Sequence, residues 1–262
     1  MELESNSGGT FVTRDILAVP PVPADERIAY GDDPNQFFDF WRPVGAVPWG
    51  AVVMIHGGFW RARYDLTHTS PLCAVLANRG LEVANLEYRR VGDPGGGWPN
   101  TFLDVLAGFN AACNTFSDPS KVVVLGHSAG GHLALRLACD IDAMWGVLAL
   151  APVACLDLAY KMGLSNGAVA EFLGGTPEDL PATYETACPS RQESSVRRVI
   201  LQGSADEIVP SALTDCYVDR QLSKPGTVTV VEVPGANHFD LIDPESKVWP
   251  TLLECLHELL KN

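Results

Sequence analysis

A serine flanked by two glycines stands near the middle of the chain, in the segment Gly126-His127-Ser128-Ala129-Gly130. An apolar run precedes this segment, and residues with helical spacing follow it at once. In such a setting Gly-x-Ser-x-Gly predicts a sharp strand-to-helix turn that exposes the serine hydroxyl at a helix N-terminus, where backbone N–H groups stabilise a developing anion. The glycines let strand and helix approach closely. The pattern therefore predicts that Ser128 is a nucleophile.

A second glycine pair follows an earlier apolar run, in His56-Gly57-Gly58-Phe59. Glycines directly after a strand allow the backbone to turn its N–H groups toward a neighbouring site, and a loop of this kind supplies half of an oxyanion hole. Phe59 stands where such loops often have a third glycine. The expected donors are the N–H groups of Gly58 and Phe59, together with that of Ala129. His56 is expected to fix this loop by hydrogen bonding.

The two segments together resemble the α/β-hydrolase superfamily, and within it the esterase and kynurenine formamidase (arylformamidase) branch. The resemblance rests on residues 56–60 and 126–132, and it extends from about Arg27 to the C-terminus. It implies a mostly parallel central sheet with helices on both faces and a catalytic triad. In this superfamily the triad follows the chain order serine, then acid, then histidine.

A serine hydroxyl is a weak nucleophile until an imidazole accepts its proton. Of the six histidines, only His238 and His257 follow a plausible acid along the chain. His257 lies within an amphipathic helical pattern, whereas His238 comes in a loop directly after a β-type run. Because catalytic loops gather at the carboxyl ends of parallel strands, His238 is the predicted general base.

The acid of the triad is expected after the preceding strand, where Asp206 and Glu207 both stand. The segment Gly203-Ser-Ala-Asp206-Glu-Ile-Val-Pro210 resembles the Gly-x-x-Asp-x-x-Val-Pro segment of the superfamily, and this resemblance favours Asp206. Glu207 is expected to be exposed or to cap the following helix. Asp240 and Asp243 are weaker alternatives, which more plausibly hold the loop around the histidine.

The elements that must position these residues alternate between strand and helix patterns along the chain. An insertion at about 156–191 interrupts the alternation and is expected to form a short cap with one helix at about 166–173. We expect a single α/β-hydrolase domain over residues 1–262, with an N-terminal arm over 1–26. The expected strands are 27–30, 37–42, 51–55, 82–88, 121–125, 144–150, 198–202 and 228–233, and the expected helices are 71–78, 101–114, 129–139, 211–221 and 244–260.

Composition limits the possible partners and location. The chain has 262 residues, of which 47% are hydrophobic, and a formal net charge of −14. This charge makes nucleic acid and anionic membranes unfavourable partners, and no apolar stretch is long enough for a membrane span. The N-terminus lacks the features of a signal peptide. The seven cysteines have no C-x-x-C pair, and we expect them to be reduced core thiols in a cytoplasmic protein.

The substrate pocket is expected to be apolar, because aromatic residues occur in the loops that should meet there. Phe59, Trp98 and Phe239 are the candidates. His127 and His132 are five residues apart and have no partner that would complete a metal site. Neither a nucleotide-binding pattern nor a metal site is indicated, so we expect no cofactor. His132 is expected to pack or bond behind the turn that holds Ser128.

These features predict a serine hydrolase that cleaves small carboxylic esters or amides through an acyl-enzyme. A carboxylesterase with a preference for short acyl groups is favoured, and arylformamidase activity on N-formylkynurenine is the alternative that the resemblance implies. A non-catalytic ligand receptor on the same fold is a third hypothesis, although a receptor would not need all three triad residues. The expected partner is a small molecule, and a homodimer is left open.

Overall fold

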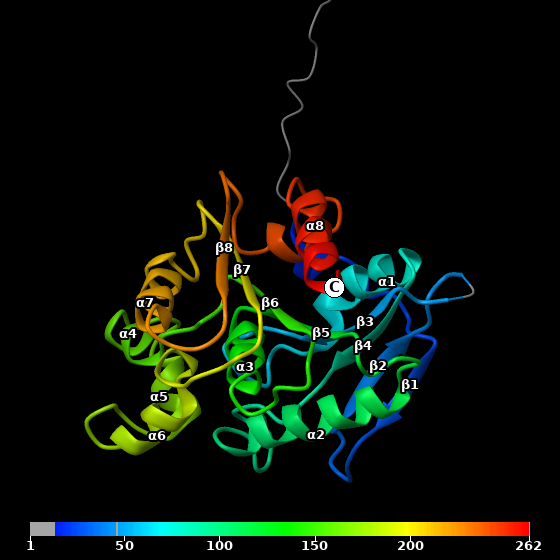
Figure 1. Ribbon diagram of the computed structural model, residues 1–262. Helices are drawn as coiled ribbons and strands as arrows, with labels where there is room; N and C mark the ends of the chain where they lie inside the picture. The colour runs from blue at the N-terminus through cyan, green and yellow to red at the C-terminus, as the bar shows by residue number, and fades with distance from the viewer. Residues whose placement is uncertain (1–13, 46, 262) are drawn as a thin grey trace, which may run out of the picture.

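The computed structural model describes residues 14–45 and 47–261, so the first half of the expected N-terminal arm lies outside the described residues. Eight strands form one sheet in the order β1-β2-β4-β3-β5-β6-β7-β8 (Figure 1). The first two strands pair antiparallel, as do β2 and β4, and all other pairs are parallel. The strands are β1 (Glu26–Ala29), β2 (Phe37–Trp41), β3 (Gly50–Ile55), β4 (Leu81–Leu86), β5 (Val122–His127), β6 (Gly146–Leu150), β7 (Arg198–Gly203) and β8 (Val228–Val233).

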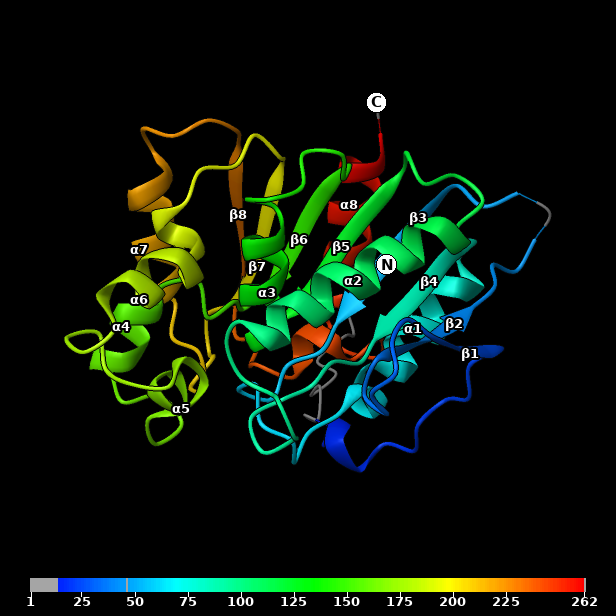
Figure 2. The ribbon, with the colours of Figure 1, turned by 90° about the horizontal axis from the view of Figure 1, so that it is seen from below.

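Helices cover both faces of this sheet, which confirms the predicted fold class. Helices α2 (Asn100–Thr115) and α3 (Ala129–Leu137) lie on one face, whereas α1 (Ser70–Asn78) and α8 (Trp249–Leu260) lie on the other (Figures 1 and 2). The remaining helix outside the insertion, α7 (Ala212–Gln221), lies near the β8 edge. Short 3₁₀ turns occur at η1 (Ile16–Ala18), η2 (Leu66–Thr69), η3 (Pro189–Arg191) and η4 (Asp240–Ile242).

The central strands are buried on both faces and mainly apolar, as is usual for parallel strands covered by helices. Every residue of β3, β4, β5 and β6 is buried. Fully burying one such aliphatic side chain stabilises the fold by about 1.5–3 kcal/mol. The edge strand β8 differs, because three of its six residues are exposed. The centre of the sheet is therefore a rigid platform for the loops at its carboxyl edge.

The register of the sheet places the two glycine segments side by side. In the β3–β5 pair, Ile55 lies opposite Gly126. The loop that starts at His56 therefore leaves the sheet next to Ser128. On the other side of β5, His127 lies opposite Leu150 of β6.

The insertion contains more helix than the sequence pattern indicates. Instead of one helix, it forms α4 (Leu156–Lys161), α5 (Ala168–Leu173) and α6 (Pro181–Ala187), which lie beside α7 (Figures 1 and 2). Each of the three has only six or seven residues. Such short helices carry too little periodicity to be recognised, and they depend on packing against their neighbours. Helix α8 also begins later than expected, at Trp249, because turns occupy residues 244–248.

One cysteine prediction is wrong. Cys155 and Cys216 form a disulfide whose Cα atoms are 6.3 Å apart. It joins the N-cap of α4 to α7, across 61 positions of sequence. Sequence spacing does not reveal which distant cysteines lie close together in the folded chain. The expected cytoplasmic location rested on all cysteines being reduced, so it loses that support. The other five cysteines are free thiols.

Within residues 14–45 and 47–261, no helix combines the length and apolar character that crossing a membrane requires. The same part of the chain contains no cluster of three or more His, Cys, Asp or Glu side chains arranged to hold a metal ion.

Candidate active site

Ser128 occupies the turn that its flanking glycines predict. It follows the last residue of β5, precedes the first residue of α3, and has a φ of 57° and a ψ of −118°. Residues other than glycine rarely adopt this backbone conformation, and it persists here because the surrounding structure enforces it. A Cβ atom at Gly126 would lie 2.3 Å from the carbonyl oxygen of Gly130, and one at Gly130 would lie 2.0 Å from that of Ile55. Both glycines are therefore required for the close approach of strand, helix and loop.

The loop after β3 turns sharply beside this serine. Gly58, Phe59 and Trp60 have φ values of 112°, 51° and 58°. A Cβ atom at Gly57 would lie only 3.0 Å from the Cβ of Ser128, so the loop touches the turn directly. Within the described ranges, the backbone N–H groups of Gly58, Phe59 and Ala129 donate to no protein acceptor. All three predicted oxyanion donors are thus free to bind a ligand oxygen.

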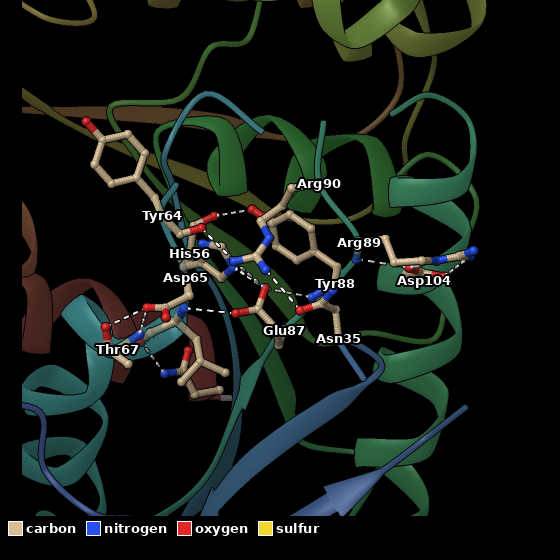
Figure 3. A network of polar contacts seen from close by, with 12 residues as sticks. Asn35, His56, Tyr64, Asp65, Thr67, Glu87, Tyr88, Arg89, Arg90 and Asp104 are labelled. Carbon is tan, nitrogen blue, oxygen red and sulfur yellow. Dashed lines mark hydrogen bonds and ion pairs between the residues drawn. The ribbon is translucent and has the colours of Figure 1, made fainter. Parts of the chain in front are cut away.

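A buried polar network fixes this loop from behind (Figure 3). Nε2 of His56 lies 2.9 Å from Glu87 Oε1, and its Nδ1 lies 2.8 Å from the carbonyl oxygen of Gly57. The Glu87 carboxylate also accepts from the backbone N–H groups of Leu66 and Tyr88. The Tyr88 hydroxyl donates to the carbonyl oxygen of His56 over 2.8 Å, and the two rings stack. Because these groups are almost fully buried, the network holds the loop in one conformation.

The predicted acid and base meet in the structure. Nδ1 of His238 lies 2.7 Å from Oδ2 of Asp206, and the Asp206 side chain is completely buried. Oδ1 of Asp206 accepts from the backbone N–H groups of Ile208 and Val209, at 2.9 and 2.8 Å. These bonds fix the carboxylate, so it can hold the imidazole in one orientation. Ser128 and His238 are both nearly buried and line the same cavity.

The alternative acids and bases have other roles in the structure. His257 is exposed on α8, where its ring packs against Trp49 with 4.5 Å between ring centroids. Glu207 is exposed. Oδ2 of Asp240 accepts from the backbone N–H of Asn237, and Oδ1 of Asp243 accepts from Arg14. Asp240 therefore holds the loop around His238, as the sequence indicated, whereas Asp243 binds Arg14 and the backbone N–H of Glu245 in the turn before α8.

The cavity is small and mainly apolar, with a volume of about 100 Å³. Phe59 and Phe239 line it, whereas Trp98 does not. The assignment of Trp98 to the pocket is therefore corrected: its ring stacks on Phe102, with 5.5 Å between centroids, and contacts Phe172 edge to face. It packs α2 against the cap. The complete lining is Leu17, Gly58, Phe59, Arg63, Tyr64, His68, His127, Ser128, Ser165, Ile208, His238 and Phe239.

Several of these lining residues carry polar groups that the sequence did not single out. Arg63 and Tyr64 stand a few positions after residues 56–60, which we call the glycine loop, so their position in the sequence could have indicated that they lie near the site. No recognisable sequence pattern marks His68 as a cavity residue. Ser165 comes from the cap, between α4 and α5, and only the fold brings it to the cavity.

Two of the histidines in the cavity are held in the neutral form by burial. Burial lowers the pKa of His68 to about 4. Burial, and secondarily the neighbouring His238, lowers the pKa of His127 well below its ordinary value. Since a neutral imidazole carries one ring proton, the contact of His127 Nε2 with the carbonyl oxygen of His238, at 3.1 Å, requires that proton on Nε2. His127 Nδ1 is buried and has no partner among the described residues.

The cap is anchored to the glycine loop by one arginine. Arg61 donates to Glu171 Oε2 over 2.6 Å, to Ser165 Oγ over 3.0 Å and to the Ser165 carbonyl oxygen over 2.9 Å. Behind it, Trp60 is fully buried and stacks on Phe172 of α5 with 4.5 Å between centroids. His132 packs edge to face on the same indole, and its Nε2 contacts the carbonyl oxygen of Ala187 at 3.0 Å.

Comparison with known proteins gives several esterases as relatives. A family model described as BD-FAE matches residues 39–145. Esterase LipC of Mycobacterium tuberculosis is 27% identical over 252 residues, covering 83% of this chain but 60% of LipC, so the chain spans less than two thirds of that relative. The versiconal hemiacetal acetate esterase of Dothistroma septosporum is 38% identical over 265 residues, covering 88% of this chain and 79% of the relative.

Solved structures agree on the fold. A truncated carbohydrate esterase from gut microbiota superposes with a TM-score of 0.77 at 18% identity, covering 92% of this chain and 99% of that one. Esterase Est2 of Thermogutta terrifontis superposes with a TM-score of 0.72 at 20% identity, covering 91% and 92% of the two chains. The formamidase branch finds no support among these relatives. The family follows from the order of the sheet, the position of Ser128 at the turn after β5 and the match to the Dothistroma septosporum esterase over most of the length of both proteins. The chain belongs to the α/β-hydrolase esterases.

Proposed function

We propose that this protein is a serine carboxylesterase that hydrolyses esters of short carboxylic acids through an acyl-enzyme. Ser128 is the nucleophile, His238 the general base, and Asp206 the acid that orients His238. The observation that carries the proposal is the His238 Nδ1–Asp206 Oδ2 contact of 2.7 Å beside a cavity that Ser128 also lines. Bound to Nδ1, the carboxylate leaves Nε2 of the imidazole to accept the serine proton.

The reaction proceeds in two halves. In the first, His238 takes the Ser128 proton while Oγ attacks the ester carbonyl, and the resulting oxyanion accepts from the N–H groups of Ala129, Gly58 and Phe59. The C–O bond to the alcohol then breaks, and the alcohol leaves with the proton from His238. In the second half, His238 activates a water molecule, which attacks the acyl-enzyme and releases the acid and free Ser128.

A short acyl preference follows from the size of the cavity. Its volume is about 100 Å³, and the rings of Phe59 and Phe239 line it. One extra methylene group that fits a pocket changes discrimination by only about 1–3 kcal/mol, so a steep loss along an acyl series indicates steric exclusion. We expect 4-nitrophenyl acetate and butyrate to be cleaved with far higher kcat/KM than the decanoate or the palmitate. A maximum at long chains would contradict the narrow cavity.

The mechanism is tested by covalent labelling with a fluorophosphonate, followed by mass-spectrometric mapping of the labelled residue. We expect the label on Ser128, and we expect Ser128→Ala to lower kcat by several orders of magnitude without changing the melting temperature by more than a few degrees. Cys139→Ser, in the turn that follows the C-terminal end of α3, is the matched control and should retain full activity. Labelling elsewhere, or wild-type turnover by Ser128→Ala, would refute the proposal.

A further inference from the structure

One cation lies at the rim of the catalytic cavity without a carboxylate partner. Arg63 lines the cavity and is exposed. Within residues 14–45 and 47–261, no Asp or Glu forms an ion pair with it. By contrast, the nearby Arg61, Arg89 and Arg90 each pair with a carboxylate, namely Glu171, Asp104 and Asp93. In a chain with a net charge of −14, an arginine left unpaired at this place needs an explanation.

The guanidinium of Arg63 lies against the ring of Tyr64, and it donates to no acceptor among residues 14–45 and 47–261. Its central carbon lies 4.7 Å from the centroid of the Tyr64 ring, which also lines the cavity. An arginine stacked on an aromatic face keeps the N–H groups at its planar edge free for a bidentate acceptor. The nearest acidic residue in sequence, Asp65, is engaged elsewhere, because its Oδ1 accepts from the backbone N–H and the hydroxyl of Thr67.

The backbone that carries Arg63 is anchored on both sides. Nη1 of Arg90 donates to the carbonyl oxygen of Tyr64 over 2.7 Å (Figure 3). The Tyr64 backbone N–H donates to the carbonyl oxygen of Arg61 over 3.2 Å, and Arg61 is itself bound to the cap. The rim position of Arg63 is therefore fixed relative to the glycine loop, and little order has to be created when a ligand binds.

The other lining groups leave this charge uncompensated. Asp206 lies behind His238 and does not line the cavity, so Arg63 carries the formal charge of the lining. His68 and His127 are neutral at ordinary pH, since burial lowers the pKa of both. Water-filled rims with one sign of charge attract ligands of the opposite sign.

We propose that Arg63 is a specificity-determining residue that selects esters whose leaving group carries a carboxylate. In this proposal the small cavity holds the short acyl group against Ser128, and the alcohol portion of the ester extends to the rim, where Arg63 is exposed. An anionic alcohol portion would form a charge-assisted, two-pronged contact with Arg63. This inference rests on the proposed serine esterase function and adds the substrate class to it.

A matched pair of acetate esters tests the inference. The anion 4-acetoxybenzoate and its neutral methyl ester, methyl 4-acetoxybenzoate, share the same acyl group and differ in one charge. We expect wild-type kcat/KM to favour the anion about tenfold or more, which is the scale of one hydrogen bond to a charged group. In Arg63→Gln the preference should disappear, because activity on the anion falls more than activity on the methyl ester. Arg63→Glu should favour the methyl ester.

The matched control is Arg79→Gln, which removes an exposed arginine at the C-terminal end of α1, outside the cavity lining. It should leave the preference unchanged. Raising the salt concentration from 50 to 500 mM should reduce the wild-type preference, whereas the ratio of the two kcat/KM values of Arg63→Gln should stay the same.

Binding separates this inference from the proposed function. The Kd of each ester is measured on Ser128→Ala, with and without Arg63→Gln, where turnover does not interfere. Tighter binding of the anion that is lost in Arg63→Gln supports the inference about Arg63. It does so even if the wild-type protein turns over neither ester, a result that would count against the esterase proposal alone. Ser128-dependent turnover of both esters with equal kcat/KM, and equal Kd values, would overturn the role of Arg63 and leave the esterase standing.

Discussion

Nε2 of His127 lies 3.1 Å from the backbone carbonyl oxygen of His238, so the residue before the proposed nucleophile is bound directly to the proposed general base. This contact joins the end of β5 to the loop after β8. Burial keeps this imidazole neutral by lowering its pKa, and the contact with the carbonyl oxygen requires that its one ring proton lies on Nε2. His127 is therefore a positioning residue for His238.

Replacement of His127 tests this role. His127→Leu removes the donor and leaves the carbonyl group of His238 unpaired, so we expect kcat to fall about 10- to 100-fold while KM changes little. His127→Gln can place an amide N–H near the original Nε2 position and should recover most of the activity. If steady-state kinetics give the same kcat for the two variants, the hydrogen bond has no positioning role.

The carboxylate of Asp206 makes two kinds of contact, and its amide analogue cannot satisfy both. In Asp206→Asn the amide oxygen would keep accepting from Ile208 and Val209, which turns the NH₂ group toward His238 Nδ1. That arrangement forces the proton of the imidazole onto Nε2, and a protonated Nε2 cannot accept the proton of Ser128. We expect kcat to fall by about 10⁴.

Glu207→Gln is the control for this substitution, because Glu207 is exposed and adjacent in sequence. It should keep wild-type kcat. Comparing kcat of the two variants by steady-state kinetics, with thermal unfolding to check folding, decides between the two acids. A larger loss in Glu207→Gln would transfer the role to the neighbouring residue.

The sequence was sufficient for the parts of the molecule that depend on local pattern. All eight strands occur within two residues of the bounds that the sequence predicts, and Ser128 lies at the predicted turn. Local pattern works here because the Gly126 and Gly130 positions tolerate no Cβ atom, so the sequence records the geometry directly.

Features that depend on contacts between distant segments were not predictable in this way. The Cys155–Cys216 bond and the place of Ser165 in the cavity both follow from how the cap folds back on α7 and on the glycine loop. Trp98 shows the opposite error. Its loop is near the carboxyl edge of the sheet, but its ring packs between Phe102 and Phe172, because an indole buries more apolar surface there than at an open rim.

The contact between Arg61 and the cap predicts a variant with impaired substrate binding. Arg61→Gln removes the bonds to Glu171 and most of those to Ser165, so the cap segment that completes the cavity loses its anchor. We expect KM for 4-nitrophenyl butyrate to rise several-fold, with faster proteolysis between α4 and α5.

Arg191→Gln is the matched control, because Arg191 pairs with Glu185 and Asp157 at the base of the cap and does not contact Ser165. It should leave KM and the proteolysis pattern near their wild-type values. Equal sensitivity of the two variants would mean that the cap responds to any lost ion pair, and that Arg61 has no special place.

Buried neutral histidines make the folded state sensitive to acid. Burial lowers the pKa of His68 and of His132 to about 4, whereas an unfolded chain titrates histidine near its ordinary value of 6.5. Between these two values the unfolded state binds protons that the folded state does not, so the free energy of unfolding falls as the pH falls. The stability is fully present above about pH 6.5 and is lost progressively down to about pH 4, by about 2–3 kcal/mol for each histidine.

This pH dependence is measured by urea unfolding at pH 7.0 and pH 4.5. Wild-type protein should lose several kcal/mol between the two conditions, and His68→Gln should lose about 2 kcal/mol less, because glutamine takes up no proton in the unfolded chain. His257→Gln removes a histidine that is exposed on α8 and should follow the wild-type curve. Since His68 is almost buried, His68→Gln can lower stability at both pH values, so the test is the difference between the two measurements in each variant. An identical difference in wild type and His68→Gln would show that His68 titrates alike in the folded and unfolded states.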